Sequence, residues 1–216
     1  QKLRGMFAFV IWDKAEKELF GARDIFGIKP FYYYKDGKEF LFGSEIKSFL
    51  SHPGFQKELR EEKIPEYLSY EYLPDEETIF KNVYKLPGAH CFTYQNGEMQ
   101  IERYYRIQYR AEEDRSLEYW EQEITREFTE SVAMHQISDV EVGCFLSSGV
   151  DSSYVVKEIS KGTKKVKTFS VGYEEEKYSE LPYAQDFSSV VGVPNISNKV
   201  SADEFFDAMP EIQYFM

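Results

Sequence analysis

Residues 147–152 are the part of the chain best suited to chemistry. They read Ser-Ser-Gly-Val-Asp-Ser and follow a short apolar run at 141–146. Small side chains and Gly149 let a backbone come close to an anion, and the free N–H groups of a following helix point at the same place. Asp151 would repel a lone anion, but it suits one that arrives with Mg²⁺, which seeks carboxylate and phosphate oxygens. The segment predicts a nucleotide or pyrophosphate site.

The flanking residues favour this prediction over a turn in which Asp151 or a serine only caps a helix. Apolar residues have helical spacing over 152–160, and a second strand is expected over 166–171, closed by Gly172. A strand–helix–strand unit implies a parallel pair with a right-handed crossover, and ligands of such sheets bind beyond the carboxyl ends of the strands. No Lys follows the loop, so a conventional P-loop is not expected.

The remaining elements follow from periodicity and turn residues. Residues 6–13, 18–24, 31–35 and 40–43 predict four strands of one antiparallel sheet, the first of them buried on both faces. Asn96-Gly97 predicts the turn of a later hairpin. Helices and a further strand are expected in several other segments: helices at 44–50, 61–70, from 117 onward, at 181–191 and at 201–215, and a strand at 195–200.

Two motifs carry a family resemblance. Residues 21–33 read Gly-Ala-Arg-Asp-Ile-Phe-Gly-Ile-Lys-Pro-Phe-Tyr-Tyr and resemble the Gly-x-Arg-Asp-x-x-Gly-x-Lys-Pro-Leu-Tyr-Tyr segment of class II glutamine amidotransferases. Residues 147–152 resemble the Ser-Gly-Gly-x-Asp-Ser motif of pyrophosphatase-type (PP-loop) ATP enzymes, with Ser148 in place of the first glycine. With the matching segments 6–9, 42–50 and 86–88, this order resembles the glutamine-hydrolysing asparagine synthetase family from about residue 3 to 216.

The resemblance implies a fold and a domain order. It implies the C-terminal part of a class II glutaminase domain at 1–108, an α+β Ntn-type remnant in which antiparallel sheets are combined with helices. A linker is expected at 109–116, and the N-terminal part of an α/β parallel-sheet PP-loop domain at 117–216. Both ends read as cut, so the N-terminal cysteine nucleophile and the later synthetase motifs would lie outside the chain. No catalytic residue is therefore predicted within it, and the fragment alone is expected to be inactive.

The resemblance also implies a ligase with two ligand sites. Glutamine would supply ammonia, and MgATP would adenylate the side-chain carboxylate of aspartate before amidation. Leu146, just before the loop, and Val171, at the end of the second strand, fall on the two positions whose backbone contacts adenine in that family. The pyrophosphate positions are Ser147, Ser148, Gly149, Val150, Asp151 and Ser152, with Asp151 as the Mg²⁺ ligand. The cofactors are then ATP and Mg²⁺, and a homodimer is left open.

Composition limits the other partners. The net charge of −12 disfavours nucleic acid and anionic membranes, and no apolar run approaches membrane-spanning length. Two cysteines fit a reducing cytoplasm, and both are expected to be structural. Two rival interpretations stay open: a related ligase of the β-lactam synthetase or peptide cyclase type, and a non-catalytic scaffold.

Overall fold

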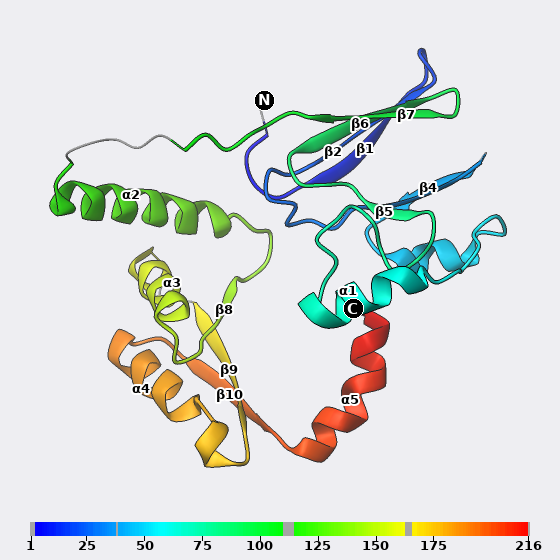
Figure 1. Ribbon diagram of the computed structural model, residues 1–216. Helices are drawn as coiled ribbons and strands as arrows, with labels where there is room; N and C mark the ends of the chain where they lie inside the picture. Colours follow the sequence, from blue (N-terminus) through cyan, green and yellow to red (C-terminus); the bar gives the residue numbers. More distant parts are fainter. Residues whose placement is uncertain (1–2, 38, 110–114, 163–165, 216) are drawn as a thin grey trace. The chain divides into compact units, whose positions relative to one another are not determined.

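The chain forms two compact units, Gln1–Arg110 and Ala111–Met216 (Figure 1). The computed structural model describes residues 3–37, 39–109, 115–162 and 166–215. Residues 110–114 of the predicted linker lie outside the described residues. Within the described ranges, no helix combines the length and the apolar character that crossing a bilayer requires.

The first unit contains two antiparallel sheets. One has the strand order β1-β2-β6-β7, and its strands are β1 (Ala8–Asp13), β2 (Glu18–Arg23), β6 (His90–Gln95) and β7 (Glu98–Arg103). The other has the order β4-β3-β5, and its strands are β3 (Tyr32–Asp36), β4 (Glu39–Gly43) and β5 (Val83–Lys85). The prediction that the first four strands share one sheet is wrong. β2 already has β1 and β6 on its two edges, so β3 pairs with β4 and β5 instead.

One core cluster of the first unit lies between these two sheets, separate from the cluster of Tyr34, Phe49 and Val83. Phe31, Tyr33, Leu86 and Phe92 are buried there, and partly buried side chains of both sheets pack against them. The prediction that the first strand is buried on both faces is wrong: β1 is an edge strand, and Trp12 is 51% exposed. One face of β1 contributes to the core while its end reaches solvent.

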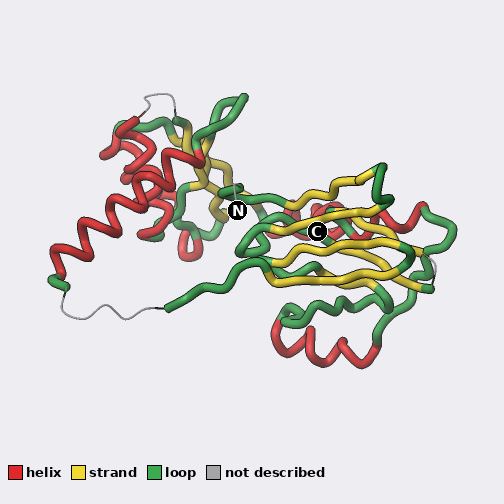
Figure 2. Tube along the Cα trace, turned by 90° about the horizontal axis from the view of Figure 1, so that it is seen from above, coloured by secondary structure: helices red, strands yellow, loops and turns green. Residues whose placement is uncertain are grey.

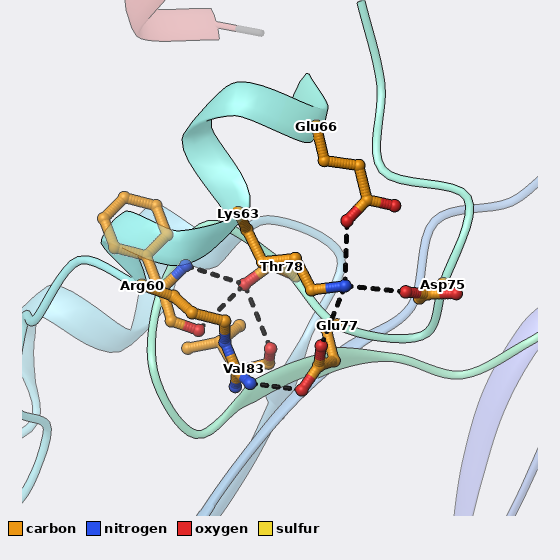
Figure 3. A network of polar contacts seen from close by, with 8 residues as sticks. Arg60, Lys63, Glu66, Asp75, Glu77, Thr78 and Val83 are labelled. Carbon is orange, nitrogen blue, oxygen red and sulfur yellow. Dashed lines mark hydrogen bonds and ion pairs between the residues drawn. The ribbon is translucent and has the colours of Figure 1, made fainter. Parts of the chain in front are cut away.

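The helical turns of the first unit follow β4 and precede β5 in the chain. They are the 3₁₀ turns η1 (Ile46–Ser51) and η2 (Glu61–Lys63) and the helix α1 (Ile64–Tyr70). Figure 2 shows the helical segments of the chain in red and its strands in yellow. Figure 3 shows Lys63 between Asp75, Glu66 and Glu77, at 2.7, 2.9 and 3.2 Å, with Arg60 also on Glu77. Hydrogen bonds to these carboxylates raise the pKa of Lys63, and the bond to Asp75 has the largest effect. The cluster joins the helical turns to the chain that enters β5.

The second unit is a parallel sheet with helices. The strand order is β10-β9-β8, and both neighbouring pairs are parallel. Its elements in chain order are α2 (Leu117–His135), β8 (Gly143–Phe145), α3 (Val150–Gly162), β9 (Lys167–Tyr173), η3 (Glu176–Tyr178), α4 (Leu181–Val191), β10 (Asn195–Val200) and α5 (Ala202–Phe215). The helix predicted at 201–215 begins with a capping box, since the Glu204 amide donates to Ser201 Oγ at 3.2 Å and the Ser201 amide to Glu204 Oε2 at 2.9 Å.

Helices α2, α3 and α4 pack against the sheet and form the core of the second unit with it. Val132, Val156 and Ala184 from these helices are buried with Cys144 and Leu146. Along β9, burial alternates, so that even-numbered residues face the core and odd-numbered ones are exposed. Gly172 does not close the strand as predicted. It lies inside β9, where an added Cβ would be 2.5 Å from the Leu181 side chain of α4.

Candidate nucleotide site

The predicted anion loop joins β8 to α3 at the carboxyl end of the sheet. β8 ends at Phe145, and α3 begins at Val150, two residues before the predicted helix start. Asp151 consequently lies in the first turn of α3. Residues 147–151 are all exposed, so the loop is open to solvent rather than covered by other side chains.

Two serines shape the loop from within. Ser147 Oγ and Ser152 Oγ lie 3.0 Å apart, and the Ser147 amide donates to Ser152 Oγ at 3.2 Å. Ser147 Oγ also accepts the Gly149 amide at 3.2 Å, while Ser152 Oγ donates to the Gly149 carbonyl at 3.1 Å. Neither Ser148 nor Gly149 has a positive φ, so a serine fits without backbone strain where the motif has its first glycine.

The loop already presents one amide to an anionic oxygen. The Ser148 amide donates to Glu180 Oε2 at 3.1 Å, and Glu180 directly precedes α4. The sequence prediction did not include Glu180. A signal was available, because a carboxylate between the end of the second parallel strand and the next helix lies at the same sheet edge as the loop.

The start of α3 adds further donors. The first amides of a helix have no carbonyl four residues earlier within that helix, and here these are the amides of Val150, Asp151 and Ser152. The helix dipole adds positive potential at this end. The Ser153 amide, in contrast, donates to the Gly149 carbonyl at 3.2 Å. Three amides therefore stand together at one exposed loop, next to two serine hydroxyls that bond to each other and to the loop backbone, and amides at the start of a helix are donors that phosphate oxygens use.

Asp151 fits a magnesium ion better than a metal with an all-protein site. Among the described residues, no group of three or more His, Cys, Asp or Glu side chains could hold a metal. Mg²⁺ needs no such group, because it usually takes one or two carboxylates, several waters and substrate phosphates. The oxygen donors of Asp151, Ser147 and Ser152 have the hard character that this cation prefers.

Leu146 and Val171, the predicted adenine positions, lie at the same edge of the sheet. The backbone ladder between β8 and β9 ends where the Leu146 amide donates to the Phe169 carbonyl at 2.9 Å. Strand residues two apart point their backbone groups to the same side, so Val171 presents its N–H and C=O to the edge that β8 has left. The Leu146 carbonyl accepts from Ser170 Oγ at 2.7 Å. Val171 thus offers the more open pair of backbone groups.

The two cysteines and Arg23 have positions that suit a structural role rather than a catalytic one. Cys144 is buried and Cys91 partly buried, and burial raises the pKa of both thiols, which disfavours the reactive thiolate. The Arg23 guanidinium donates to the backbone carbonyls of Gly27, Lys29 and Leu86 at 2.5–2.7 Å. Arg23 therefore holds together the turn that follows β2.

The class of protein follows from the two units and from comparison with known families. Residues 1–105 match the family described as glutamine amidotransferase domain. Residues 123–216 match the family described as asparagine synthase. The antiparallel sheets fall in the first match and the parallel sheet with its anion loop in the second. The chain therefore combines an amidotransferase part with a synthase part.

Curated relatives narrow the class. The chain is 36% identical over 215 residues to asparagine synthetase [glutamine-hydrolyzing] 1 of Bacillus subtilis, covering 98% of this chain and 33% of the relative. It is 36% identical over 191 residues to a putative glutamine-hydrolysing asparagine synthetase of Methanocaldococcus jannaschii, covering 85% and 36%. An amidase of Gibberella zeae is 34% identical over 175 residues, covering 75% and 25%. The chain belongs to the glutamine-hydrolysing asparagine synthetase family, and it spans about a third of the length of these synthetases.

Proposed function

We propose that the protein is a glutamine-dependent asparagine synthetase. Residues 1–108 would belong to its glutaminase domain, of Ntn-type fold, and 117–216 to its PP-loop nucleotide domain, with 109–116 between them. The observation that carries the nucleotide site is the loop after β8, where the Ser148 amide holds a carboxylate oxygen next to the first-turn amides of α3. A backbone donor that holds one anionic oxygen is placed to hold another.

ATP would bind with its phosphates on the loop and its base at the sheet edge. Ser147, Ser152 and the amides from 148 to 152 would donate to phosphate oxygens. Asp151 would hold Mg²⁺, which supplies neutralisation of the charge on the departing pyrophosphate. Val171 would pair with the edge of the adenine ring, because its N–H and C=O face the end of β8. Leu146 would contribute through its backbone, because its side chain is buried in the core.

The chemistry needs this site because a free carboxylate is a poor acyl donor, having no good leaving group for ammonia to displace. In the proposed reaction the side-chain carboxylate of aspartate gains an AMP leaving group, and ammonia from glutamine displaces it. Exclusion of water is then essential, since water would hydrolyse the activated carboxylate. The residues of this chain bind and orient the nucleotide for that step. We also propose a cytoplasmic location, because both cysteines are free thiols.

The test is equilibrium binding of MgATP by titration calorimetry to the protein and to Asp151→Asn. Loss of a carboxylate that holds Mg²⁺ should weaken binding by about tenfold or more, equivalent to about 1.4 kcal/mol. Asp203→Asn is a matched control, because Asp203 occupies the same second position of α5. Equal affinities for all three proteins would remove Asp151 from the site. A well-folded protein that binds no MgATP would refute the nucleotide site and favour a scaffold.

A related ligase is the second candidate, because the similarity extends to relatives with other names, among them the Gibberella zeae amidase. Such an enzyme would use the same nucleotide site with a different carboxylate. Pyrophosphate release by the full-length protein, measured with aspartate and with other carboxylates, distinguishes the two. Release that depends on aspartate supports the synthetase, whereas release that another carboxylate stimulates more strongly supports the alternative.

A further inference from the structure

Buried hydrogen bonds lead from β10 through β9 to the start of the anion loop. The Asn195 amide nitrogen donates to Ser170 Oγ at 2.9 Å, and Ser170 Oγ donates to the Leu146 carbonyl at 2.7 Å. The same amide nitrogen donates to Thr168 Oγ1 at 2.9 Å, and Thr168 Oγ1 donates to the Pro194 carbonyl at 3.0 Å. Thr168 is 0% and Ser170 4% exposed. Polar side chains thus occupy the core face of a central strand.

The direction of these bonds is determined by chemistry. A carbonyl oxygen only accepts, so each hydroxyl must give its one proton to its carbonyl partner. Ser170 and Thr168 can then only accept from Asn195, which fixes the orientation of that amide. The Asn195 Oδ1 atom is left as one of the buried side-chain atoms without a hydrogen-bond partner among the described residues. Leaving a buried acceptor unpaired costs stability, so the two bonds made by the nitrogen outweigh the one that is missing.

Ser170 acts on the peptide group that begins the loop. The Leu146 carbonyl and the Ser147 amide belong to one planar peptide unit. Ser170 Oγ holds the oxygen of this unit, and Ser152 Oγ accepts its N–H at 3.2 Å. The peptide plane is therefore held on both sides, and one of the two holders, Ser152, is itself a predicted phosphate donor.

We propose that Ser170 is a positioning residue for the phosphate loop, with Asn195 orienting it from β10. This inference rests on the proposed nucleotide site, but it concerns a residue that touches the loop rather than the ligand. Ser170 keeps the Leu146–Ser147 peptide plane in the orientation that brings Ser147 and Ser152 together. Without its hydroxyl the peptide can rotate, and the loop would have to be ordered at the expense of nucleotide affinity.

Thr168→Val is a matched control for Ser170→Ala. Each change removes one buried hydroxyl of β9 and one acceptor of Asn195, but the Thr168 hydroxyl contacts Pro194 rather than the loop. In the intact protein, calorimetry with MgATP should show about a tenfold higher Kd for Ser170→Ala and a Kd within about twofold of wild type for Thr168→Val. Ser170→Thr keeps the hydroxyl and should recover most of the affinity. The amide NMR resonance of Ser147 should shift without ligand in Ser170→Ala alone.

The outcomes separate this inference from the function on which it rests. If wild type binds MgATP and Ser170→Ala binds equally well, the positioning role is refuted while the nucleotide site stands. If Ser170→Ala and Thr168→Val weaken binding equally, the effect is general destabilisation of the sheet and the positioning role is also refuted. If folded wild type binds no MgATP, both the proposed function and this role are wrong.

Discussion

Replacement of the Asp24 carboxylate should strongly destabilise the first unit. Asp24 is 1% exposed and accepts four backbone N–H groups. Oδ1 accepts those of Phe26 and Ile28 at 3.2 and 2.9 Å, and Oδ2 accepts those of Lys29 and Phe7 at 3.0 and 3.3 Å. Burial alone would raise the pKa of this carboxyl, but the four donors together lower it below the ordinary value of 3.8. The ionised carboxylate thus holds the chain that leads from β2 to β3.

The change Asp24→Asn keeps one oxygen and places an NH₂ group against two backbone N–H groups. Each buried donor that loses its acceptor costs about 1–3 kcal/mol, so the free energy of unfolding should fall by about 2–6 kcal/mol. That is a large part of the roughly 5–15 kcal/mol that stabilises a domain. The melting temperature of the first unit should fall by about 10 °C or more.

The measurement can isolate the first unit because the sequence has only two tryptophans, Trp12 and Trp120. In a Trp120→Phe background, urea denaturation followed by fluorescence of Trp12 reports on the first unit. Asp13→Asn is the control: Asp13 Oδ1 alone accepts the amides of Ala15 and Glu16, at 2.8 and 3.1 Å, so asparagine can keep both bonds. Equal midpoints for the two variants would refute the role assigned to Asp24.

The same carboxylate predicts a pH dependence. Because the folded-state pKa of Asp24 lies below its unfolded value, its contribution to stability is complete above about pH 4 and is lost as the pH falls through the folded-state pKa. The difference in unfolding free energy between wild type and Asp24→Asn should therefore shrink on acidification. A difference that stays constant down to pH 2 would contradict the assigned protonation state.

Two further predictions concern the loop after β8 and the turn at Gly88. Glu180→Gln removes the charge from the oxygen that the Ser148 amide holds, so magnesium pyrophosphate should bind about two- to tenfold more tightly. Calorimetry measures this affinity, and unchanged or weaker binding would show that Glu180 does not compete for that amide. Gly88→Ala places a Cβ 2.8 Å from the Gly27 amide nitrogen and 2.9 Å from the Ile25 carbonyl oxygen. Because this contact is too close, the unfolding free energy followed by Trp12 fluorescence should fall by about 1–3 kcal/mol. An unchanged denaturation midpoint would show that the backbone relaxes freely.

Elements with strong local patterns could be predicted from the sequence. The helix at 181–191 has the expected bounds, because its apolar spacing is regular and Gly192 ends it with a positive φ. The strand at 195–200 also has the expected bounds. The hairpin turn at Asn96-Gly97 is confirmed for the same reason, since both residues have the positive φ that the turn requires. In these cases the information lies within a few residues of the element.

Pairing between distant segments could not be predicted in this way. β5 has only three residues, Val83–Lys85, too few to show a period, and it becomes a strand because β3 offers it an edge. The division of the first four strands between two sheets likewise depends on β6, which takes the free edge of β2 from far along the chain. Neither fact has a local pattern, because each results from which edges remain unpaired when the chain folds.

The residues of the proposed nucleotide site differ in the same way in how far the sequence predicts them. The loop residues Ser147 to Ser152 are adjacent in sequence, so their chemistry could be predicted from a short motif. Glu180 and Ser170 reach the loop from other elements, and only the sheet brings them there. Yet these two residues set opposite properties: Ser170 holds the loop in its shape, whereas Glu180 occupies one of its donors. Two proteins with the same loop motif should therefore differ in anion affinity according to the residues at these two places, because the motif supplies the donors and the fold decides how many of them are available.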